Sequence, residues 1–343
     1  MRFIGCKSLL LDNIKSIIDE KAPDAQSFCD IFSGTATVAR YFKQWYEVYS
    51  NDVLYFSYVL QKGTIENDEL PTFNGLNQIL GISDPIDYFN SIDLSEMENL
   101  PQARRFFQNT YSPIGGRMYV TDENALRIDY ARNTVDDWHK DKLITNNEYF
   151  YLVACIVEGI PFVSNTSGTY GAFHKEWERR SHKIYEVFRL DVTTNHKKNK
   201  SYNCNGADLL KNISGDILYI DPPYNERQYL PNYHVLETAA KYDFPEVRGV
   251  TGQRPYENQK SEFCSKSKVL NAFDELIRNA QFRHIILSYS TDGLMTVNDI
   301  AATMKQYGKK HTFKIYEIPY RRYKSRNVTL TSQLKELMFY VEK

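Results

Sequence analysis

Short, largely apolar runs bounded by polar turns mark the predicted strands of this chain. Runs of this kind, repeated along a chain, are typical of strands in a folded core. The last two runs look like an antiparallel pair that closes a sheet. The predicted strands are residues 27–32, 46–49, 216–220, 284–288, 312–318 and 337–341.

Helical spacing predicts a buried helix at residues 149–163, the longest apolar segment. The segment is too short to span a membrane, and it contains Glu158 and Pro161. The start of the chain has charged residues and lacks a sustained apolar stretch, so we expect no signal peptide and no membrane segment. The helical stripe consists of Tyr149, Leu152, Val153, Ile156, Val157 and Ile160.

Length and composition predict a globular protein with more than one structural part. The chain has 343 residues, of which 42% are hydrophobic and 25% charged, and this is ordinary globular usage. It is too long for one small domain, so we expect a core with a large insertion or a second domain. The 26 tyrosines would suit stacking on nucleic-acid bases, and a tyrosine-rich core is the alternative for most of them.

The net charge bears on the expected binding partner, and the cysteine usage bears on the cellular compartment. The formal net charge of −1 is not that of an obvious nucleic-acid binder, so a DNA-facing surface requires segregated charge. The five cysteines are an odd number without C-x-x-C spacing. They indicate a reduced, cytoplasmic protein without a metal site.

A proline-rich turn, Asp221-Pro222-Pro223-Tyr224, directly follows the predicted strand 216–220. In open α/β sheets ligands bind at the carboxyl edge of the strands, and two prolines stiffen this corner. An acid and an aromatic ring on a rigid turn suit a planar substrate with an amino group, because the ring stacks on its face while oxygens accept its N–H bonds. A simple strand-ending turn is the alternative interpretation.

A second turn connects the predicted strand 27–32 to a helix that runs to about residue 45, and it contains one glycine, Gly34. The fingerprint that cradles a dinucleotide pyrophosphate has three glycines, so this turn argues against NAD. It allows close approach of an adenosyl or amino-acid group, and a plain strand-turn-helix is the alternative. Asp52, after strand 46–49, would bind ribose hydroxyls or cap a helix at residues 53–60.

These features together resemble the D12 class of adenine-N6 DNA methyltransferases, the alpha group that includes the Dam-like enzymes. Residues 5–10 resemble its G-x-K-x-x-L segment, and residues 32–38 its F-x-G-x-G motif. Asp208 stands where the third motif has its acid, and residues 221–224 match the catalytic tetrapeptide. One departure is that Thr37 or Ala36 replaces the second glycine of the cofactor motif.

The resemblance implies an α/β fold, namely a Rossmann-like S-adenosylmethionine-dependent methyltransferase sheet with an antiparallel C-terminal strand and an inserted, mainly helical DNA-recognition region. Residues 1–64 and 176–343 would form the catalytic domain, and 65–175 the inserted target-recognition region. The resemblance also implies S-adenosylmethionine as cofactor. Cofactor binding is assigned to Lys7, Asp30, Phe32, Ser33, Gly34, Thr35, Thr37, Asp52 and Asp208, and catalysis to Asp221, Pro222, Pro223 and Tyr224.

Double-stranded DNA is the expected partner, and three segments could contact it. The loop 165–175 resembles the N-x-x-G-x-F-N loop of Dam-like enzymes, with a β-hairpin as the alternative. Residues 320–326 form the densest basic-aromatic cluster of the chain. Cations of the inserted region could touch phosphates or base edges if they converge: Arg104, Arg105, Arg117, Arg127, Arg132, Lys140 and Lys142. The residues assigned to DNA are Asn165, Tyr170, Lys175, Arg321, Arg322, Lys324 and Arg326.

The implied activity is site-specific methyl transfer to adenine N6 with base flipping, without a metal or a catalytic cysteine. The enzyme would serve a restriction-modification system, with a cognate restriction endonuclease as a candidate partner, or act as a solitary methylase. Alternative acceptors are RNA adenine, cytosine N4 and a protein amide, although the last two favour Ser and Asn at the position of Asp221. A non-catalytic DNA-binding subunit with the same fold is the alternative from another class.

Overall fold

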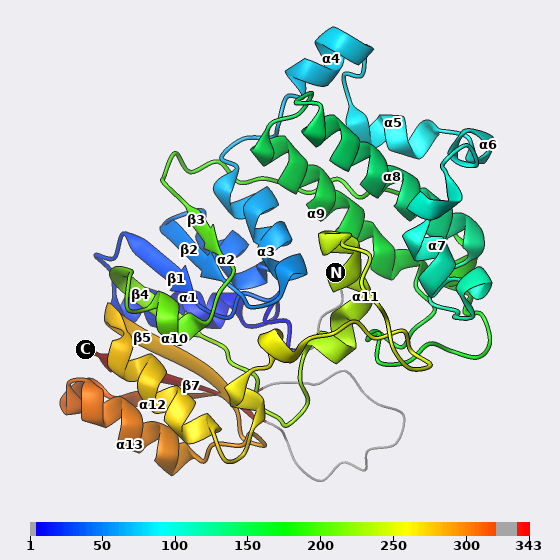
Figure 1. The fold of residues 1–343 in the computed structure, drawn as a ribbon. Helices are drawn as coiled ribbons and strands as arrows, with labels where there is room; N and C mark the ends of the chain where they lie inside the picture. The colour runs from blue at the N-terminus through cyan, green and yellow to red at the C-terminus, as the bar shows by residue number, and fades with distance from the viewer. Residues whose placement is uncertain (1–4, 320–334) are drawn as a thin grey trace. The chain divides into compact units, whose positions relative to one another are not determined.

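The computed structural model describes residues 5–319 and 335–343 and shows a mixed α/β protein made of two compact units (Figure 1). Unit 1 comprises Leu54–His196 and Tyr229–Gln259, together with the two described residues before Lys7. Unit 2 comprises Lys7–Val53, Lys197–Gln228 and the described residues from Lys260 onward.

Unit 2 contains a seven-stranded sheet with the order β3-β2-β1-β4-β5-β7-β6 (Figure 1). The neighbours from β3 to β5 are parallel, whereas β7 runs antiparallel to both β5 and β6. The sheet is thus the predicted Rossmann-like sheet with an antiparallel C-terminal pair. Its strands are β1 (Ser27–Asp30), β2 (Glu47–Asn51), β3 (Lys200–Tyr202), β4 (Ser214–Ile220), β5 (Gln281–Ser290), β6 (Lys314–Pro319) and β7 (Lys335–Glu342).

The strand order reverses at β1, which lies between β2 and β4. In the β1–β4 register, Asp30 is the partner of Tyr219, so the carboxyl ends of the two strands lie side by side. Crevices at such switch points are where open α/β sheets bind their ligands. The topology therefore brings the two predicted turns, 33–37 and 221–224, to the same edge.

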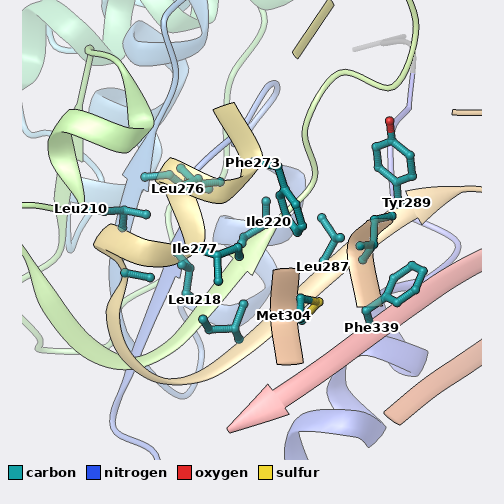
Figure 2. Packing of buried hydrophobic residues seen from close by; sticks show 14 of the residues in the cluster. Leu210, Leu218, Ile220, Phe273, Leu276, Ile277, Leu287, Tyr289, Met304 and Phe339 are labelled. Carbon is teal, nitrogen blue, oxygen red and sulfur yellow. The ribbon is translucent and has the colours of Figure 1, made fainter. Parts of the chain in front are cut away.

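One face of the sheet is covered by α10, α12 and α13 (Figure 2). Phe273, Leu276 and Ile277 of α12 and Met304 of α13 pack against alternate residues of β4, β5 and β7 in one apolar core. On the other face Phe28 of β1 stacks on Phe42 of α2, with ring centroids 4.4 Å apart. The unit 2 helices are α1 (Leu11–Lys21), α2 (Thr37–Phe42), α10 (Gly206–Leu209), α12 (Val269–Asn279) and α13 (Val297–Tyr307).

The regular secondary structure in the described residues of unit 1 is helical, apart from an isolated β-bridge between Arg248 and Gln253. Its α-helices are α3 (Tyr55–Gln61), α4 (Asn74–Leu80), α5 (Pro85–Ser91), α6 (Leu94–Met97), α7 (Phe106–Tyr111), α8 (Asp122–Lys140), α9 (Asn146–Val163) and α11 (Leu230–Lys241). Short 3-10 or π turns are η1 (Lys62–Glu66), η2 (Gln102–Arg104), η3 (Pro113–Gly115), η4 (Arg179–His182) and η5 (Glu257–Gln259); unit 2 adds η6 (Glu262–Cys264) and η7 (Lys310–Thr312).

Helix α9 is the predicted buried helix of residues 149–163, extended by one turn at its start. Thr145 and Glu148 form a capping box there, which satisfies backbone donors that the helix leaves unpaired. Gly159 lets the chain at Glu186 come close, since a Cβ at this position would lie 2.2 Å from the Glu186 carbonyl oxygen. The helix is thus capped at its start and packs closely against the chain at Glu186.

The predicted inserted region, residues 65–175, lies inside unit 1. That unit also includes α3, residues 176–196 and α11. The division into catalytic and target-recognition parts stays a prediction. Among the described residues, no helix is long and apolar enough to cross a membrane.

Candidate active site

The end of strand β4 carries a largely buried ion-pair cluster. Lys7 Nζ lies 3.0 Å from Asp221 Oδ1 and 3.0 Å from Glu336 Oε1. The side chains of Lys7 and Glu336 are 7% and 8% exposed, and that of Asp221 is 20% exposed. Ser288 Oγ donates a 2.7 Å hydrogen bond to Glu336 Oε1. One ammonium is therefore shared between the predicted catalytic carboxylate and a second carboxylate.

Burial and neighbouring charge set the ionisation of this cluster. Burial raises the pKa of Asp221 to about 6; Lys7 opposes the shift and Glu336 adds to it. Burial alone would lower the pKa of Lys7, but Asp221 and Glu336 together raise it above its usual value. Lys7 is thus an ammonium, and Asp221 is ionised at neutral pH.

Asp30, at the end of β1, is a second buried carboxyl at this edge. It is only 1% exposed, and within the described residues its Oδ1 has no hydrogen-bond partner. Burial raises its pKa to about 8, and the charges of Asp221 and Asp52 add to the shift. A buried carboxyl oxygen without a partner is costly, so Asp30 Oδ1 points to a group that the protein itself does not supply.

The turn after β1 is fixed by polar contacts to the end of β2. The Gly34 N–H donates to Asp52 Oδ2 at 2.8 Å, and the Ser33 N–H donates to the Asn51 carbonyl at 2.9 Å. Ser33 Oγ donates to the Asp30 carbonyl at 2.8 Å. Gly34 has a φ of +50°, a left-handed conformation that favours glycine. This network holds the predicted cofactor turn in one shape.

The remaining residues of the predicted cofactor motif lie in the same turn. The hydroxyls of Thr35 and Thr37 lie 3.0 Å apart, and Thr37 begins helix α2. Ala36 has a φ of +59°, a backbone conformation that is uncommon for residues other than glycine. The turn thus has a small side chain at a strained position. The Phe32 ring meets Phe263 edge-on, with centroids 5.2 Å apart. Phe32 therefore packs against another aromatic ring of unit 2 beside the turn.

Two acidic residues outside the turn, Asp52 and Asp208, are also predicted to bind the cofactor. Asp52 accepts the Gly34 N–H, whereas helix α3 starts at Tyr55 with Leu54 as its N-cap, so the capping alternative for Asp52 is not realised. Asp208 lies in α10 with its side chain 68% exposed and paired with Lys211 at 2.7 Å. Both ligand-binding roles stay predictions.

The loop after the tetrapeptide is anchored to unit 2. The Tyr224 carbonyl accepts a hydrogen bond from the Leu294 N–H at 3.0 Å, and the Tyr224 ring packs against the apolar core. Gln228 and Ser261 exchange two hydrogen bonds of 3.0 and 2.8 Å. Pro222 is buried and Pro223 half-buried. The tetrapeptide is therefore held at both ends.

In unit 1, two residues assigned to DNA are used inside the protein. Asn165 is buried, donates to the His174 carbonyl and accepts the Glu178 N–H, both at 3.0 Å. Tyr170 is also buried, and its hydroxyl lies 3.0 Å from Ser164 Oγ. These contacts position the loop, which forms turns and not the alternative hairpin. Lys175 is exposed at the end of this loop.

Several arginines of the inserted region also bind protein groups. Arg104 pairs with Asp137 at 2.8 Å, and the fully buried Arg132 pairs with Asp136 at 3.1 Å. Arg105 donates to the Leu100 carbonyl, and Arg117 to the carbonyls of Gly249 and Val250. By contrast Lys140 and Lys142 are exposed and Arg127 is half-buried. Residues Arg321, Arg322, Lys324 and Arg326 lie outside the described residues.

Glu336 and Ser288 were not predicted from the sequence. Glu336 directly precedes the predicted strand 337–341, and Ser288 is the last residue of the predicted strand 284–288. Each is a polar side chain at one end of an apolar run, on the face opposite the α12–α13 core. These polar positions were the available signal. Within residues 5–319 and 335–343, no group of His, Cys, Asp and Glu side chains is arranged to hold a metal ion.

Curated relatives match the whole chain. It is 48% identical to Type II methyltransferase M.FokI of Planomicrobium okeanokoites, covering 100% of the chain and 53% of the relative. It is 40% identical to Modification methylase StsI of Streptococcus sanguinis, covering 100% of the chain and 52% of the relative. Against these two, the chain spans about half the length of the relative.

A third relative is matched over most of its own length. The chain is 35% identical to Type II methyltransferase M.NlaIII of Neisseria lactamica, with 95% of the chain and 93% of the relative covered. Residues 3–303 match the family described as D12 class N6 adenine-specific DNA methyltransferase. With the parallel sheet, its antiparallel C-terminal strands and this match over most of the sequence, the chain belongs to the D12 class N6 adenine-specific DNA methyltransferase family.

Proposed function

We propose that this chain transfers a methyl group from S-adenosylmethionine to the N6 amino group of adenine at a specific site in double-stranded DNA. The observation that carries the proposal is the group of carboxylates at the carboxyl ends of β1 and β4, in a chain of the D12 class. The relatives are named Type II methyltransferases or modification methylases. A role in a restriction-modification system, beside a cognate restriction endonuclease, is therefore favoured over a solitary methylase.

The strand ends fit S-adenosylmethionine, which supplies an electrophilic methyl group on a positively charged sulfonium. Asp52 and Asp221 place negative charge around one edge, and the carboxyl of Asp30, whose pKa is raised to about 8, has an Oδ1 without a protein partner among the described residues. Carboxyl groups of this kind attract a cation or an N–H donor. Gly34 leaves the backbone of the turn open to close approach.

The tetrapeptide would hold the acceptor base. Tyr224 would stack on adenine, while Asp221 and the Pro222 carbonyl each accept one N6–H bond. The amino nitrogen then attacks the methyl carbon as the bond from that carbon to sulfur breaks, and the electron pair leaves with sulfur. The extra proton leaves N6 towards Asp221, which is ionised at neutral pH. Rate enhancement comes mainly from positioning two bound reactants.

Adenine in a duplex hides its N6 edge, so we propose base flipping, at a cost of a few kcal/mol. Exposed cations at the end of the 165–175 loop and directly after it in unit 1 would contact phosphates. Lys175, Arg179 and Lys183 are exposed, and Arg180 is bonded to the Thr166 carbonyl and Glu178. Phosphate contacts of this kind fix register and orientation without reading sequence. The 320–326 cluster is proposed for the same task from its sequence alone.

Methyl transfer to synthetic duplexes and to DNA from expressing cells tests the proposal. The purified chain should label double-stranded DNA from methyl-labelled S-adenosylmethionine, and sequencing with modification detection should report N6-methyladenine at one recurrent site. Matched RNA of the same sequence should stay unlabelled. Labelled RNA would favour the RNA acceptor, and absence of both labelling and calorimetric cofactor binding would favour a non-catalytic DNA-binding subunit.

A further inference from the structure

One face of the unit 2 sheet carries a row of polar side chains near its carboxyl end. Residues Cys29, Ile31, Leu218, Ile220, Leu287 and Phe339 point into the α12–α13 core. Because side chains alternate along a strand, their neighbours point to the opposite face. Asp30, Tyr219, Asp221 and Ser288 are such neighbours, and Glu336 precedes Leu337, which also lies in this core.

Glu336 is the member of this row that the proposed chemistry leaves without a task. It lies at the start of β7, is buried, and has no place in the motifs of the sequence. Its carboxylate receives two donors, Ser288 Oγ at 2.7 Å and Lys7 Nζ at 3.0 Å. A buried carboxylate that is hydrogen-bonded and ion-paired in this way has a fixed position.

We propose that Glu336 is a positioning residue for methyl transfer, which acts through Lys7 to fix the place and the charge of Asp221. The inference rests on the proposed function, because it needs Asp221 to hold the amino group. It assigns to Lys7 a task at Asp221 in place of the contact with the cofactor that its motif implies. Glu336 itself touches neither reactant.

The position of Lys7 between two carboxylates affects how strongly Asp221 can accept hydrogen bonds. Lys7 Nζ is 3.0 Å from both carboxylates, so its positive charge is divided between them. Without the charge of Glu336, the ammonium would pair with Asp221 alone. Asp221 would then be a weaker acceptor for amino N–H bonds, and Lys7 would have one fixed partner fewer.

Other groups that face this cluster bear on its titration. The charges of Asp221 and Asp52 add to the raised pKa of Asp30. The buried Tyr219 hydroxyl lies among them, and burial, Asp221 and Glu336 keep its pKa above the ordinary value. Glu336 adds to the raised pKa of Asp221, whereas Lys7 lowers it. Removal of the Glu336 charge should therefore let Asp221 ionise at lower pH.

Steady-state kinetics of Glu336→Gln test the inference. We expect kcat to fall roughly tenfold or more, since misplacement of a reacting group by about 1 Å costs on the order of a hundredfold. The KM values for DNA and S-adenosylmethionine should stay within about twofold, and the acidic limb of the kcat profile should move down by roughly half a pH unit or more. Glu342→Gln, on the same strand and paired with Lys309, is the matched control and should leave all three unchanged.

A double variant separates action through Lys7 from an independent role. Lys7→Met leaves Glu336 buried beside Asp221 without a cation, so its kcat should fall further than that of Glu336→Gln. The pair Lys7→Met/Glu336→Gln should recover part of that loss, because the like charge is gone. Losses that simply multiply would overturn the inference, and so would an unchanged kcat and acidic limb in Glu336→Gln. A raised KM for S-adenosylmethionine at constant kcat would assign the pair to cofactor binding instead.

Two further measurements apply if Glu336→Gln does not fold or if the wild-type chain is inactive. If Glu336→Gln does not fold, Ser288→Ala removes a donor from Glu336 without changing any charge. Glu336 then draws Lys7 away from Asp221, so the acidic limb should move up, and a limb that stays in place contradicts the inference. If the wild-type chain transfers no methyl group, the proposed function fails by itself. The pKa of Asp221 can still be measured without methyl transfer, from the difference in the pH dependence of the unfolding free energy between wild type and Asp221→Asn. This pKa must be lower when the same comparison is made in the Glu336→Gln background.

Discussion

Lys7 Nζ and Asp221 Oδ1 lie 3.0 Å apart, so a residue from the start of unit 2 meets the strand-end acid that follows β4. The two positions are distant in sequence, and each belongs to a separate motif of the D12 resemblance. Their contact makes Asp221 an ionised acceptor within a charge-paired setting, although burial raises its pKa to about 6. The methyl acceptor site is therefore proposed to depend on the charge of its neighbours as well as on the tetrapeptide.

Replacement of Asp221 by alanine should abolish methyl transfer while cofactor binding persists. The variant removes the acceptor for one N6–H bond and leaves the turn at Gly34 intact, so we expect kcat to fall by about a hundredfold or more. Radiolabelled transfer and calorimetric titration with S-adenosylmethionine give the two readings. Asp19→Ala, an exposed acid of α1 paired with Lys15, is the control. Retained activity in Asp221→Ala would remove the catalytic role.

Asp30 predicts a pH-dependent loss of stability. Its folded-state pKa, about 8, lies above the ordinary value because of burial and nearby acids. The folded protein thus binds this proton more tightly, and the free energy of unfolding should fall as pH rises from about 4 to about 8. Asp30→Asn should lack this fall and gain on the order of a few kcal/mol relative to wild type at pH 9. Urea unfolding between pH 5 and 9 measures the difference.

Asp216 provides the control of opposite sign for that experiment. It accepts hydrogen bonds from the Gln26 and Ser27 N–H groups and from Ser27 Oγ, each at 2.9 Å. Burial opposes the shift, but these donors lower its pKa. Its ionised form stabilises the fold above the ordinary pKa, and this contribution is lost as pH falls. Asp216→Asn should therefore destabilise at neutral pH, and equal pH profiles for the two variants would contradict both assignments.

Asp52 should affect cofactor affinity through the shape of the turn. Its carboxylate holds the Gly34 N–H at 2.8 Å. Asp52→Ala removes this hydrogen bond and any direct contact to ribose, so the Kd for S-adenosylmethionine should rise about tenfold, which corresponds to about 1.4 kcal/mol. Asp52→Asn keeps an acceptor oxygen and should show a smaller rise. A Kd that is unchanged in both variants would place the cofactor elsewhere.

Much of the sheet could be predicted from local sequence. The strands at 27–32, 46–49, 216–220 and 284–288 form β1, β2, β4 and β5 within a few residues, and the C-terminal antiparallel pair is confirmed. Each has a dense apolar pattern and a turn after it, so burial and local chemistry agree. Strand β3 (Lys200–Tyr202) was missed because a short, polar edge strand has no such pattern.

The site was less predictable, because side-chain partners depend on tertiary contacts. Asn165 and Tyr170 carry the features of a DNA-facing loop in sequence, yet they are buried and bonded inside unit 1. Similarly, Arg132 is a cation in an inserted region but is fully buried against the Ala239 carbonyl at 2.8 Å. Sequence showed which residue types were present. It did not show which of them make hydrogen bonds and ion pairs within the protein.

That distinction gives a test for the DNA face of unit 1. Lys175 and Lys183 are exposed, so Lys175→Ala/Lys183→Ala should weaken DNA binding and reduce the slope of log K against log salt by about 0.9 for each phosphate that is no longer neutralised. Arg117 instead donates to the carbonyls of Thr110, Gly249 and Val250. Arg117→Ala should lower the free energy of unfolding by roughly 1–3 kcal/mol and leave the slope unchanged. Fluorescence anisotropy at several salt concentrations, with urea unfolding in parallel, separates the two, and a slope reduced only by Arg117→Ala would place the DNA contact at Arg117.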